Sequence, residues 1–531
     1  MAKVRSSLAL ALCLTAWGGW MAPAVAHDDE PAGAATTTAA TAQPPRAWFG
    51  PQKPPYKVET PIALIGGTLI DATGAPARAG QTVLIEGGKI KAVGPDGSIA
   101  IPADARQFDA RGMTIMPGLI NSNQHIQLNG LYPAPAADLP IAELRARWEN
   151  NFSNMENKAF VYLMQGITTM RQTSGPYQKL LPIKAKIDAG EVAGPRIELG
   201  GALIMSPQHF KAYVEKNKTP ADALEWLRNE FAYFVVDDVD RDMKPLMGPE
   251  FSYWKLYLTD EISGGSADGS LDFSDAQLRK IITMGHKLGK KIDVHANATP
   301  EGFKRLLKFD IDTLEHPFET SFLLDEKTIE GFARNNVIVA TLLRVRIAGA
   351  EHAANPNRFN QTDYIMSSTP DDYRTLMTYR DRMLYNLRNP DHRGLSIYEK
   401  RASESNMFGQ SGPSLNDQLK GRETARENMR RFIKAGVKFS MGTDSTSFLN
   451  FQQDDPNALE MEYMVEMGMS PMEAILASTR YGAEAIGKQS TLGTIEPGKI
   501  ADVIVVAGDP LKDMRAMRNV AVVIKDGIRY K

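Results

Sequence analysis

The hydrophobic pattern is that of short β-strands at both ends of the chain. From residue 62 to 116, brief apolar runs are separated by tight turns, and residues 82–93 alternate around Gly87-Gly88, which is typical of a β-hairpin. A similar pattern returns in residues 501–506 and 520–525. We therefore expect residues 57–115 and 490–531 to pair into one small sheet domain, with the middle of the chain inserted between its two halves.

In the middle of the chain, short apolar runs alternate with helical patterns. Ser470-Pro471 with Glu473 is a typical helix start, and residues 275–288 and 424–435 also have helical periodicity. The eight predicted strands are the run before Asn121, Ile167–Met170, Arg196–Leu199, Tyr253–Leu258, Ile292–His295, Thr313–Leu314, Val337–Ala340 and Lys438–Met441. Eight such units predict an α/β fold, a parallel (β/α)8 barrel over residues 116–489, with its active site at the carboxyl ends of the strands.

One connection in this region is too long for a simple loop. Residues 344–421 separate the seventh predicted strand from its helix, and insertions of this length are usually functional or disordered. We expect this insertion to cover the mouth of the barrel as a lid or a substrate-recognition element.

The first residues have the features of a secretory leader. Lys3 and Arg5 precede an apolar stretch, and Ala24-Val25-Ala26 is a small-residue cleavage site, so residues 1–26 predict a signal peptide. The stretch is shorter than the roughly 20 residues that a membrane span needs, which argues against a membrane anchor. We expect a periplasmic or secreted protein whose residues 27–56, rich in Ala, Thr and Pro, form a flexible linker.

The composition of the chain limits the kinds of molecule that it is expected to bind. The chain has 531 residues, of which 43% are hydrophobic, and a formal net charge of −2, which suggests neither a nucleic acid nor an anionic membrane as partner. Its single cysteine, Cys13, lies in the predicted leader, so thiolate metal ligands are excluded from the mature chain. A small molecule is the expected partner.

Polar residues that can bind a metal stand at the ends of the predicted strands. They are His125, Lys255, His295, His316 and Asp444. Taken singly, a strand-end histidine is more often structural, an aspartate after Gly-Thr caps a helix, and a strand lysine reaches solvent. The chain has only eight histidines, and three of them stand at the ends of predicted strands. This concentration favours a metal site instead. The period of two along a strand also places Asn123 on the same face as His125.

The motifs around these residues resemble those of the amidohydrolase superfamily, most closely its imidazolonepropionase and prolidase-like branch, the latter including Xaa-Pro and Xaa-Arg dipeptidases. The resemblance rests on Met116-Pro-Gly-Leu-Ile120, Gly166-Ile-Thr-Thr169, Gly194-Pro-Arg-Ile197, Val294-His-Ala296, Asp312-Thr-Leu-Glu-His316, Gly442-Thr-Asp444 and the run from Leu492 to Asp502. It implies a (β/α)8 TIM barrel beside a composite β-sandwich, with one or two divalent metal ions, zinc being the expected one. Related enzymes often assemble, so the resemblance is also consistent with a homo-oligomer.

The resemblance also implies roles for individual residues. His125, Lys255, His295, His316 and Asp444 match metal ligands, with Lys255 in the position of a lysine that can be carboxylated to bridge two metals. Asp444 matches the residue that takes a proton from the attacking water. His209 matches a catalytic histidine that contacts the substrate, and Tyr257 and Arg344 are the other expected substrate-binding residues. If the substrate carries a carboxylate, Arg344 or Arg346 is expected to bind it bidentately.

Two residues depart from the pattern of the family. Asn123 stands where a histidine is expected, and a neutral amide oxygen is a poor ligand for zinc. Gln172 stands where an acidic residue commonly follows the arginine of its strand. These departures leave open whether the site holds one metal or two.

The function that the sequence favours is metal-dependent hydrolysis of an amide bond in a peptide, an N-acyl amino acid or a cyclic amide. Hydrolysis of a lactone, ester or carbamate at the same site is the first alternative. A diverged barrel that binds a ligand or catalyses a metal-assisted elimination is the second.

Overall fold

The structure is a computed structural model that describes residues 60–126, 142, 149, 152, 155–173, 175–216, 233–258, 273–296, 299–345, 347, 415–445 and 455–531. The predicted signal peptide, the predicted linker and most of the insertion at 344–421 lie outside the described residues. At its far end, the insertion is shorter than expected, because a helix already begins at Leu415.

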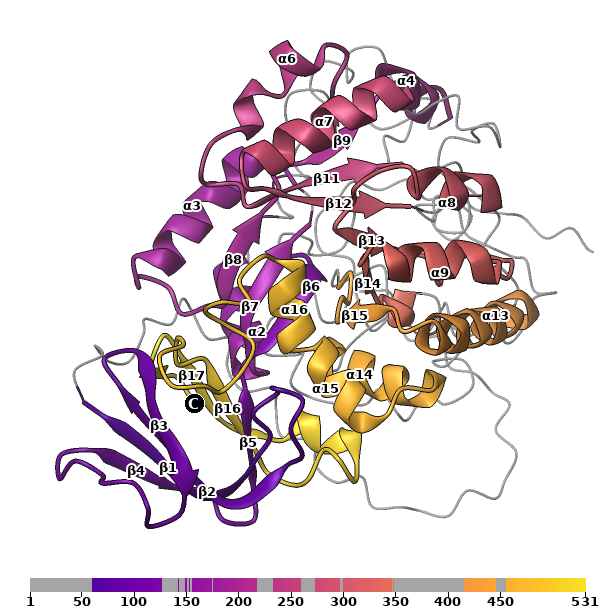
Figure 1. The fold of residues 1–531 in the computed structure, drawn as a ribbon. Helices are drawn as coiled ribbons and strands as arrows, with labels where there is room; N and C mark the ends of the chain where they lie inside the picture. The colour runs from indigo at the N-terminus through magenta and orange to yellow at the C-terminus, as the bar shows by residue number, and fades with distance from the viewer. Residues whose placement is uncertain are drawn as a thin grey trace, which may run out of the picture. The chain divides into compact units, whose positions relative to one another are not determined.

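Strands from both ends of the described chain form one sheet (Figure 1). Its order is β18-β17-β16-β5-β1-β2-β3, with β4 also paired to β1. The strands are β1 (Ile62–Leu69), β2 (Arg78–Glu86), β3 (Lys89–Pro95), β4 (Arg106–Asp109), β5 (Thr114–Pro117), β16 (Val503–Val506), β17 (Val520–Lys525) and β18 (Ile528–Arg529). The predicted hairpin is β2–β3, and both of its turn glycines have positive φ, Gly87 at 58° and Gly88 at 77°.

This sheet surrounds a core of its own. Buried residues of β1 and β2, such as Leu64 and Val83, share one hydrophobic cluster with Val505 and Val522 from the C-terminal strands. The two arms also meet directly, since Ala501 N–H donates to the Gly88 carbonyl at 2.9 Å. The resemblance implied a composite β-sandwich from both chain ends, and the described strands of both ends lie in one continuous sheet and share this hydrophobic cluster.

The middle of the chain contributes parallel strands in two further sheets. All eight predicted strands are present, and β9 and β10 were not predicted. One sheet has the order β6-β7-β8 and the other β10-β9-β11-β12-β13-β14-β15. The strands are β6 (Leu119–Gln124), β7 (Ile167–Gln172), β8 (Arg196–Leu199), β9 (Leu203–Met205), β10 (Tyr233–Val235), β11 (Tyr253–Tyr257), β12 (Lys291–His295), β13 (Thr313–Glu315), β14 (Ile338–Ala340) and β15 (Lys438–Ser440).

Both edge strands of the three-stranded sheet are linked to the seven-stranded sheet. An isolated parallel bridge joins Gln124, at the end of β6, to Ser445 beyond β15. A second one joins Leu199, at the end of β8, to Phe251 just before β11. The α/β class and the parallel direction of the predicted strands are therefore confirmed.

Helices follow most of these strands. In Figure 1, α7, α8, α9 and α13 run alongside the seven-stranded sheet. The predicted helix start at Ser470 is confirmed as a capping box with Glu473. The helices are α2 (Met155–Met164), α3 (Tyr177–Asp188), α4 (Pro207–Lys216), α6 (Val239–Asp242), α7 (Asp275–Lys287), α8 (Pro300–Leu306), α9 (Glu326–Arg334), α13 (Leu415–Lys434), α14 (Pro456–Met467), α15 (Pro471–Ala477) and α16 (Arg480–Ala485), with 3₁₀-helices η2 (Lys244–Leu246) and η5 (Met514–Arg518).

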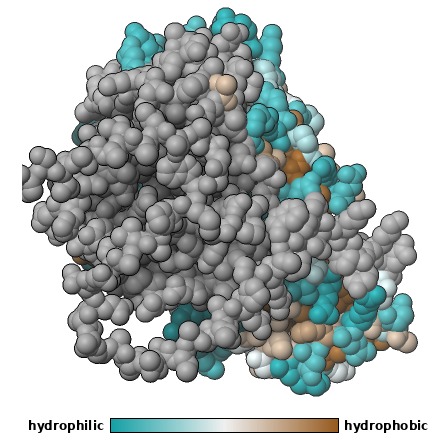
Figure 2. All heavy atoms as spheres, turned by 180° about the vertical axis from the view of Figure 1, so that it is seen from behind, coloured by the Kyte–Doolittle hydropathy of each residue, from teal (hydrophilic) through white to brown (hydrophobic). Residues whose placement is uncertain are grey.

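The surface of the described residues is mostly polar. The large hydrophobic side chains exposed among them are Leu288, Leu323 and Leu419, which are far apart in sequence. In Figure 2, the coloured part of the face is largely hydrophilic, with hydrophobic residues interspersed. Within the described part of the chain, no helix has the length and apolar character required to cross a membrane.

Candidate active site

The register of three neighbouring strands places the predicted site residues side by side. Lys255 on β11 lies opposite Asp293 on β12, and Asp293 lies opposite Thr313 on β13. Two residues further along, Tyr257 lies opposite His295, which lies opposite Glu315. Because side chains alternate along a strand, each strand directs both of its residues to the same face, and the six residues form two adjacent layers on that face.

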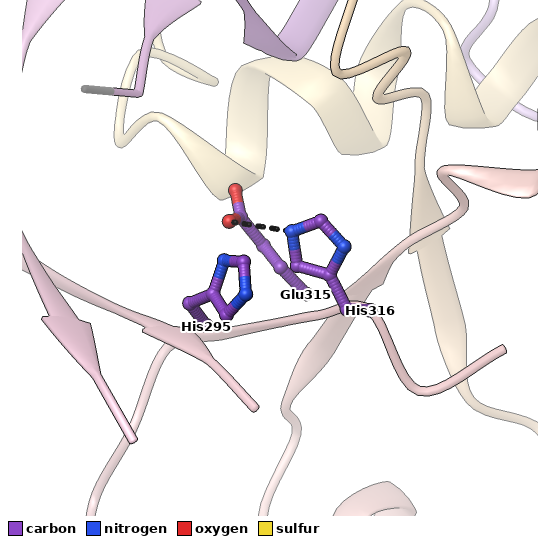
Figure 3. A group of neighbouring side chains, drawn as sticks. All are labelled: His295, Glu315 and His316. Carbon is purple, nitrogen blue, oxygen red and sulfur yellow. Dashed lines mark ion pairs between the residues drawn. The ribbon is translucent and has the colours of Figure 1, made fainter. Parts of the chain in front are cut away.

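Two buried imidazoles converge next to a carboxylate in this region. One side-chain ligand atom from each of His295, Glu315 and His316 lies within 4.8 Å of the others, and Figure 3 shows the three groups turned toward one another. The Nε2 atoms of His295 and His316 have no hydrogen-bond partner among the described residues, although both residues are at least 95% buried. Buried polar atoms are normally satisfied, so this arrangement suits a bound cation.

The protonation of the two histidines differs. Burial, followed by the charges of His316 and Lys255, lowers the pKa of His295 well below its ordinary value, which keeps this ring neutral and able to donate a lone pair. Burial alone would also lower the pKa of His316, but the Glu319 carboxylate outweighs it and raises the pKa. Glu319 contacts His316 Nδ1, so the hydrogen of the neutral ring lies on Nδ1 and Nε2 remains a donor atom for a metal.

Below the histidines lies a buried network of four charged groups. Arg171 on β7 donates to Asp293 Oδ1 at 3.0 Å and to Glu315 Oε1 at 3.3 Å, while Lys255 forms an ion pair with Glu315. Arg171, Asp293 and Glu315 are fully buried. Burial, reinforced by Asp293, raises the pKa of the Glu315 carboxyl. Two cations therefore balance two carboxylates, and the network holds Lys255 against the histidine pair.

Arg171→Met is expected to lower the free energy of unfolding by about 3–5 kcal/mol, because it leaves a buried carboxylate without its cation. Urea unfolding followed by circular dichroism measures this loss. Lys280→Met is the control, since Lys280 pairs with Asp240 at 2.6 Å on the surface, where an ion pair is worth about 1 kcal/mol or less. A loss for Arg171→Met no larger than that of the control would show that the network does not stabilise the fold.

His125 and Asp444 form the opposite side of the site. His125 Nε2 lies 2.7 Å from Asp444 Oδ1. Asn123 lies on the same side as His125, as predicted, because the Thr173 hydroxyl donates to Asn123 Oδ1 at 2.8 Å and lies 3.3 Å from His125 Nε2. Burial alone would raise the pKa of Asp444, but the hydrogen bond with His125 opposes it, and the pKa lies below its ordinary range.

Asp444 is held in a backbone conformation that is costly for a non-glycine residue. Its φ is +46°, and its N–H donates to the Asn123 carbonyl at 2.9 Å. Arg344 lies next to it and is fully buried, with its guanidinium donating to the Thr443 carbonyl at 3.1 Å. The backbone N–H of Arg344 donates to Glu460 at 3.0 Å. Arg344 thus braces the turn that carries Asp444, and Arg346 lies outside the described residues.

The expected substrate-contacting residues extend the site along a row of rings. The His209 ring is 5.1 Å from that of Tyr257, which is 4.6 Å from that of His295, which is 3.9 Å from that of His316. His209 lies near the start of α4 and is fully buried. The structure therefore brings the predicted site residues that it describes into one region at the carboxyl ends of the strands.

Sequence reasoning missed Glu315, Arg171, Asp293 and Glu319 as site residues. Asp293 stands two residues before His295, so the period of two could have placed both on one face. Glu315 and Glu319 lie within five residues of His316, inside or just after a motif that was already recognised. Only the pairing of Arg171 with carboxylates on two other strands had no signal in the sequence.

Parallel strands that gather buried histidines and carboxylates at their carboxyl ends are typical of α/β enzymes, and this group could hold a metal ion. The sequence profile of the amidohydrolase family matches residues 250–529, and the chain belongs to this family. The resemblance inferred from the motifs is confirmed, and with it the expectation of an enzyme.

Known relatives are similar over short stretches. Ochratoxinase from Aspergillus niger is 39% identical over 88 residues, 16% of this chain and 17% of that protein. Imidazolonepropionase from Geobacillus kaustophilus is 35% identical over 82 residues, 15% of this chain and 19% of that protein. The matches thus span less than a fifth of either relative.

Structural similarity is far more extensive. The crystal structure of a Xaa-Pro dipeptidase with bound methionine superposes with a TM-score of 0.63 at 22% identity. The superposition covers 89% of this chain and 100% of the dipeptidase. At this identity, the similarity concerns the fold.

Proposed function

We propose that the protein is a metal-dependent hydrolase of an amide bond in a peptide, an N-acyl amino acid or a cyclic amide. The observation that carries this proposal is the pair of buried imidazoles, His295 and His316, whose Nε2 atoms lack partners among the described residues beside Glu315. Membership of the amidohydrolase family supports it.

The donor set fits one divalent cation, zinc being our choice. His295 and His316 would hold it, with Lys255, Asp444 and Glu315 as the further groups near the pair. Such an ion supplies Lewis acidity, which lowers the pKa of water toward neutrality. Carboxylation of Lys255 would add a bridging ligand for a second ion, but Asn123 offers that position an amide in place of an imidazole.

The other residues have distinct roles in this proposal. Asp444 takes the proton of the attacking water and passes it to the leaving amine, since its pKa is low enough to keep it ionised. His209 and Tyr257, at the far end of the row of rings, contact the substrate and orient its carbonyl. Arg344 remains our candidate for an anionic group of the substrate.

We further propose that the two parallel sheets close into a (β/α)8 barrel. The bridges Gln124–Ser445 and Leu199–Phe251 support closure, because the first joins β6 to the segment after β15 and the second joins β8 to the segment before β11. β9 and β10 would then lie outside the eight-stranded ring. Export to the periplasm or medium, and assembly into a homo-oligomer, are also proposals, the first of which rests on residues 1–26.

The experiment that tests the proposed function is elemental analysis of the purified mature protein together with a substrate panel. The panel contains dipeptides, N-acyl amino acids, cyclic amides, lactones, esters and carbamates. We expect one metal per chain and cleavage of at least one amide, both lost on chelation. Cleavage confined to esters, lactones or carbamates would shift the function to the first alternative, and a protein that binds no metal would overturn the proposal.

A further inference from the structure

We propose that Gln172 is a positioning residue that fixes the tautomer of His125. Its side-chain amide makes His125 carry its hydrogen on Nε2, so that His125 donates to Asp444 and does not offer that nitrogen to a metal. This inference rests on the proposed function of the site, whose proton carrier is Asp444, and it assigns His125 to proton positioning.

The orientation of the Gln172 amide is settled by a backbone group. The N–H of Ile126 lies 2.9 Å from Gln172 Oε1, and a backbone N–H can only donate, so this end of the amide is the oxygen. The NH₂ end then faces His125 Nδ1 at 3.4 Å. Because an amide NH₂ has no lone pair to accept with, Nδ1 of His125 must be the acceptor, and the hydrogen of the neutral ring lies on Nε2.

The contacts of Nε2 agree with this assignment. Asp444 Oδ1 lies 2.7 Å from this nitrogen, and a carboxylate oxygen accepts a hydrogen. The Thr173 hydroxyl uses its one hydrogen on Asn123 Oδ1, at 2.8 Å, and therefore presents a lone pair to His125 Nε2 at 3.3 Å. Both neighbours of Nε2 are thus acceptors.

His316 shows the opposite arrangement in the same site. Its Nδ1 faces the Glu319 carboxylate, an acceptor, so its hydrogen lies on Nδ1 and its Nε2 is left as a lone pair. His125 has a donor in the place of that acceptor. The exchange of a carboxylate for an amide at residue 172 therefore turns one histidine away from metal binding, and Asn123 removes the second imidazole from the same side.

The consequence is an asymmetric site. His295 and His316 would hold the metal, whereas His125 receives its orientation from Gln172 and transmits it to Asp444 through one hydrogen bond. The hydrogen bond from His125 to Asp444 Oδ1 makes the two oxygens of this carboxylate inequivalent.

The test is two-bond ¹H–¹⁵N correlation of the zinc-loaded protein labelled with ¹⁵N-histidine, which distinguishes the two tautomers of each ring. The signal of His125 is assigned by its loss in His125→Asn. We expect wild-type His125 to carry its hydrogen on Nε2 and Gln172→Glu to move it to Nδ1. A wild-type His125 with its hydrogen on Nδ1 would overturn the inference, whether or not the variant folds.

Metal content provides a second readout. We expect one metal per chain in wild type and two in Gln172→Glu/Asn123→His, which restores both an acceptor and an imidazole. Glu319→Gln is the mirror-image control: it gives His316 the amide that His125 has, and we expect metal affinity to fall about 10–100-fold. Two metals in wild type would contradict the inference, whereas no metal in any variant would contradict the proposed function and leave the tautomer of His125 as an independent result.

Discussion

His295→Ala/His316→Ala is expected to lose its bound metal and all hydrolytic activity together. The two rings are at least 95% buried, and their centroids are 3.9 Å apart. Their Nε2 atoms have no hydrogen-bond partner in the part of the chain that the structure describes, and the proposed site is built around them. The other two imidazoles of the site are placed for other contacts, since His125 Nε2 faces Asp444 at 2.7 Å and the His209 ring lies beyond Tyr257. The carboxylates and Lys255 hold a divalent cation less tightly without the histidine pair. Elemental analysis and kcat/KM on the best substrate of the panel measure both losses.

The control for this prediction is His286→Ala. His286 lies on α7 and is 30% exposed, and its ring bonds Asp312 at 2.8 Å, away from the site. We expect the control to keep its metal and its kcat/KM. A double variant that still binds one metal per chain would place the metal elsewhere, and thermal unfolding of both proteins shows whether the site variant is folded.

Asp444→Asn is expected to lower kcat by about 10²–10⁴-fold while the metal stays bound, because general acid–base catalysis typically contributes this much. Asparagine keeps the shape of the side chain and its contact with His125, but it cannot accept the proton of water. The backbone of residue 444 has a positive φ. Asparagine tolerates this conformation better than most residues, so we expect the variant to fold.

The comparison for Asp444→Asn is Asp310→Asn, on a side chain that is 86% exposed, which we expect to leave kcat unchanged. Metal content is measured in both variants. A variant of Asp444 that loses its metal would make this residue an essential ligand, and one that keeps full kcat would remove it from proton transfer.

The strands of the middle region could be predicted because each is a short apolar run bounded by turns, and the hairpin because Gly87-Gly88 supplies two residues with positive φ. β9 and β10 could not, since runs of three residues, such as 203–205, are too short for any periodicity. The order of the terminal strands within their shared sheet also escaped prediction. It depends on β1 pairing with β2, β4 and β5 along different parts of its length.

The features of the candidate site also fall into those that the sequence predicts and those that only the structure shows. The sequence by itself determined the family, the strand-end positions of His125, His295 and His316, and the two departures at Asn123 and Gln172, because these depend on residue types at local spacings. Only the tertiary structure decided that Glu315 faces the histidine pair, that Arg171 reaches carboxylates on two other strands, and that an amide faces Nδ1 of His125. The physical reason is that charge pairing and tautomer depend on atoms that are dozens of residues apart in the chain and a few ångströms apart in space.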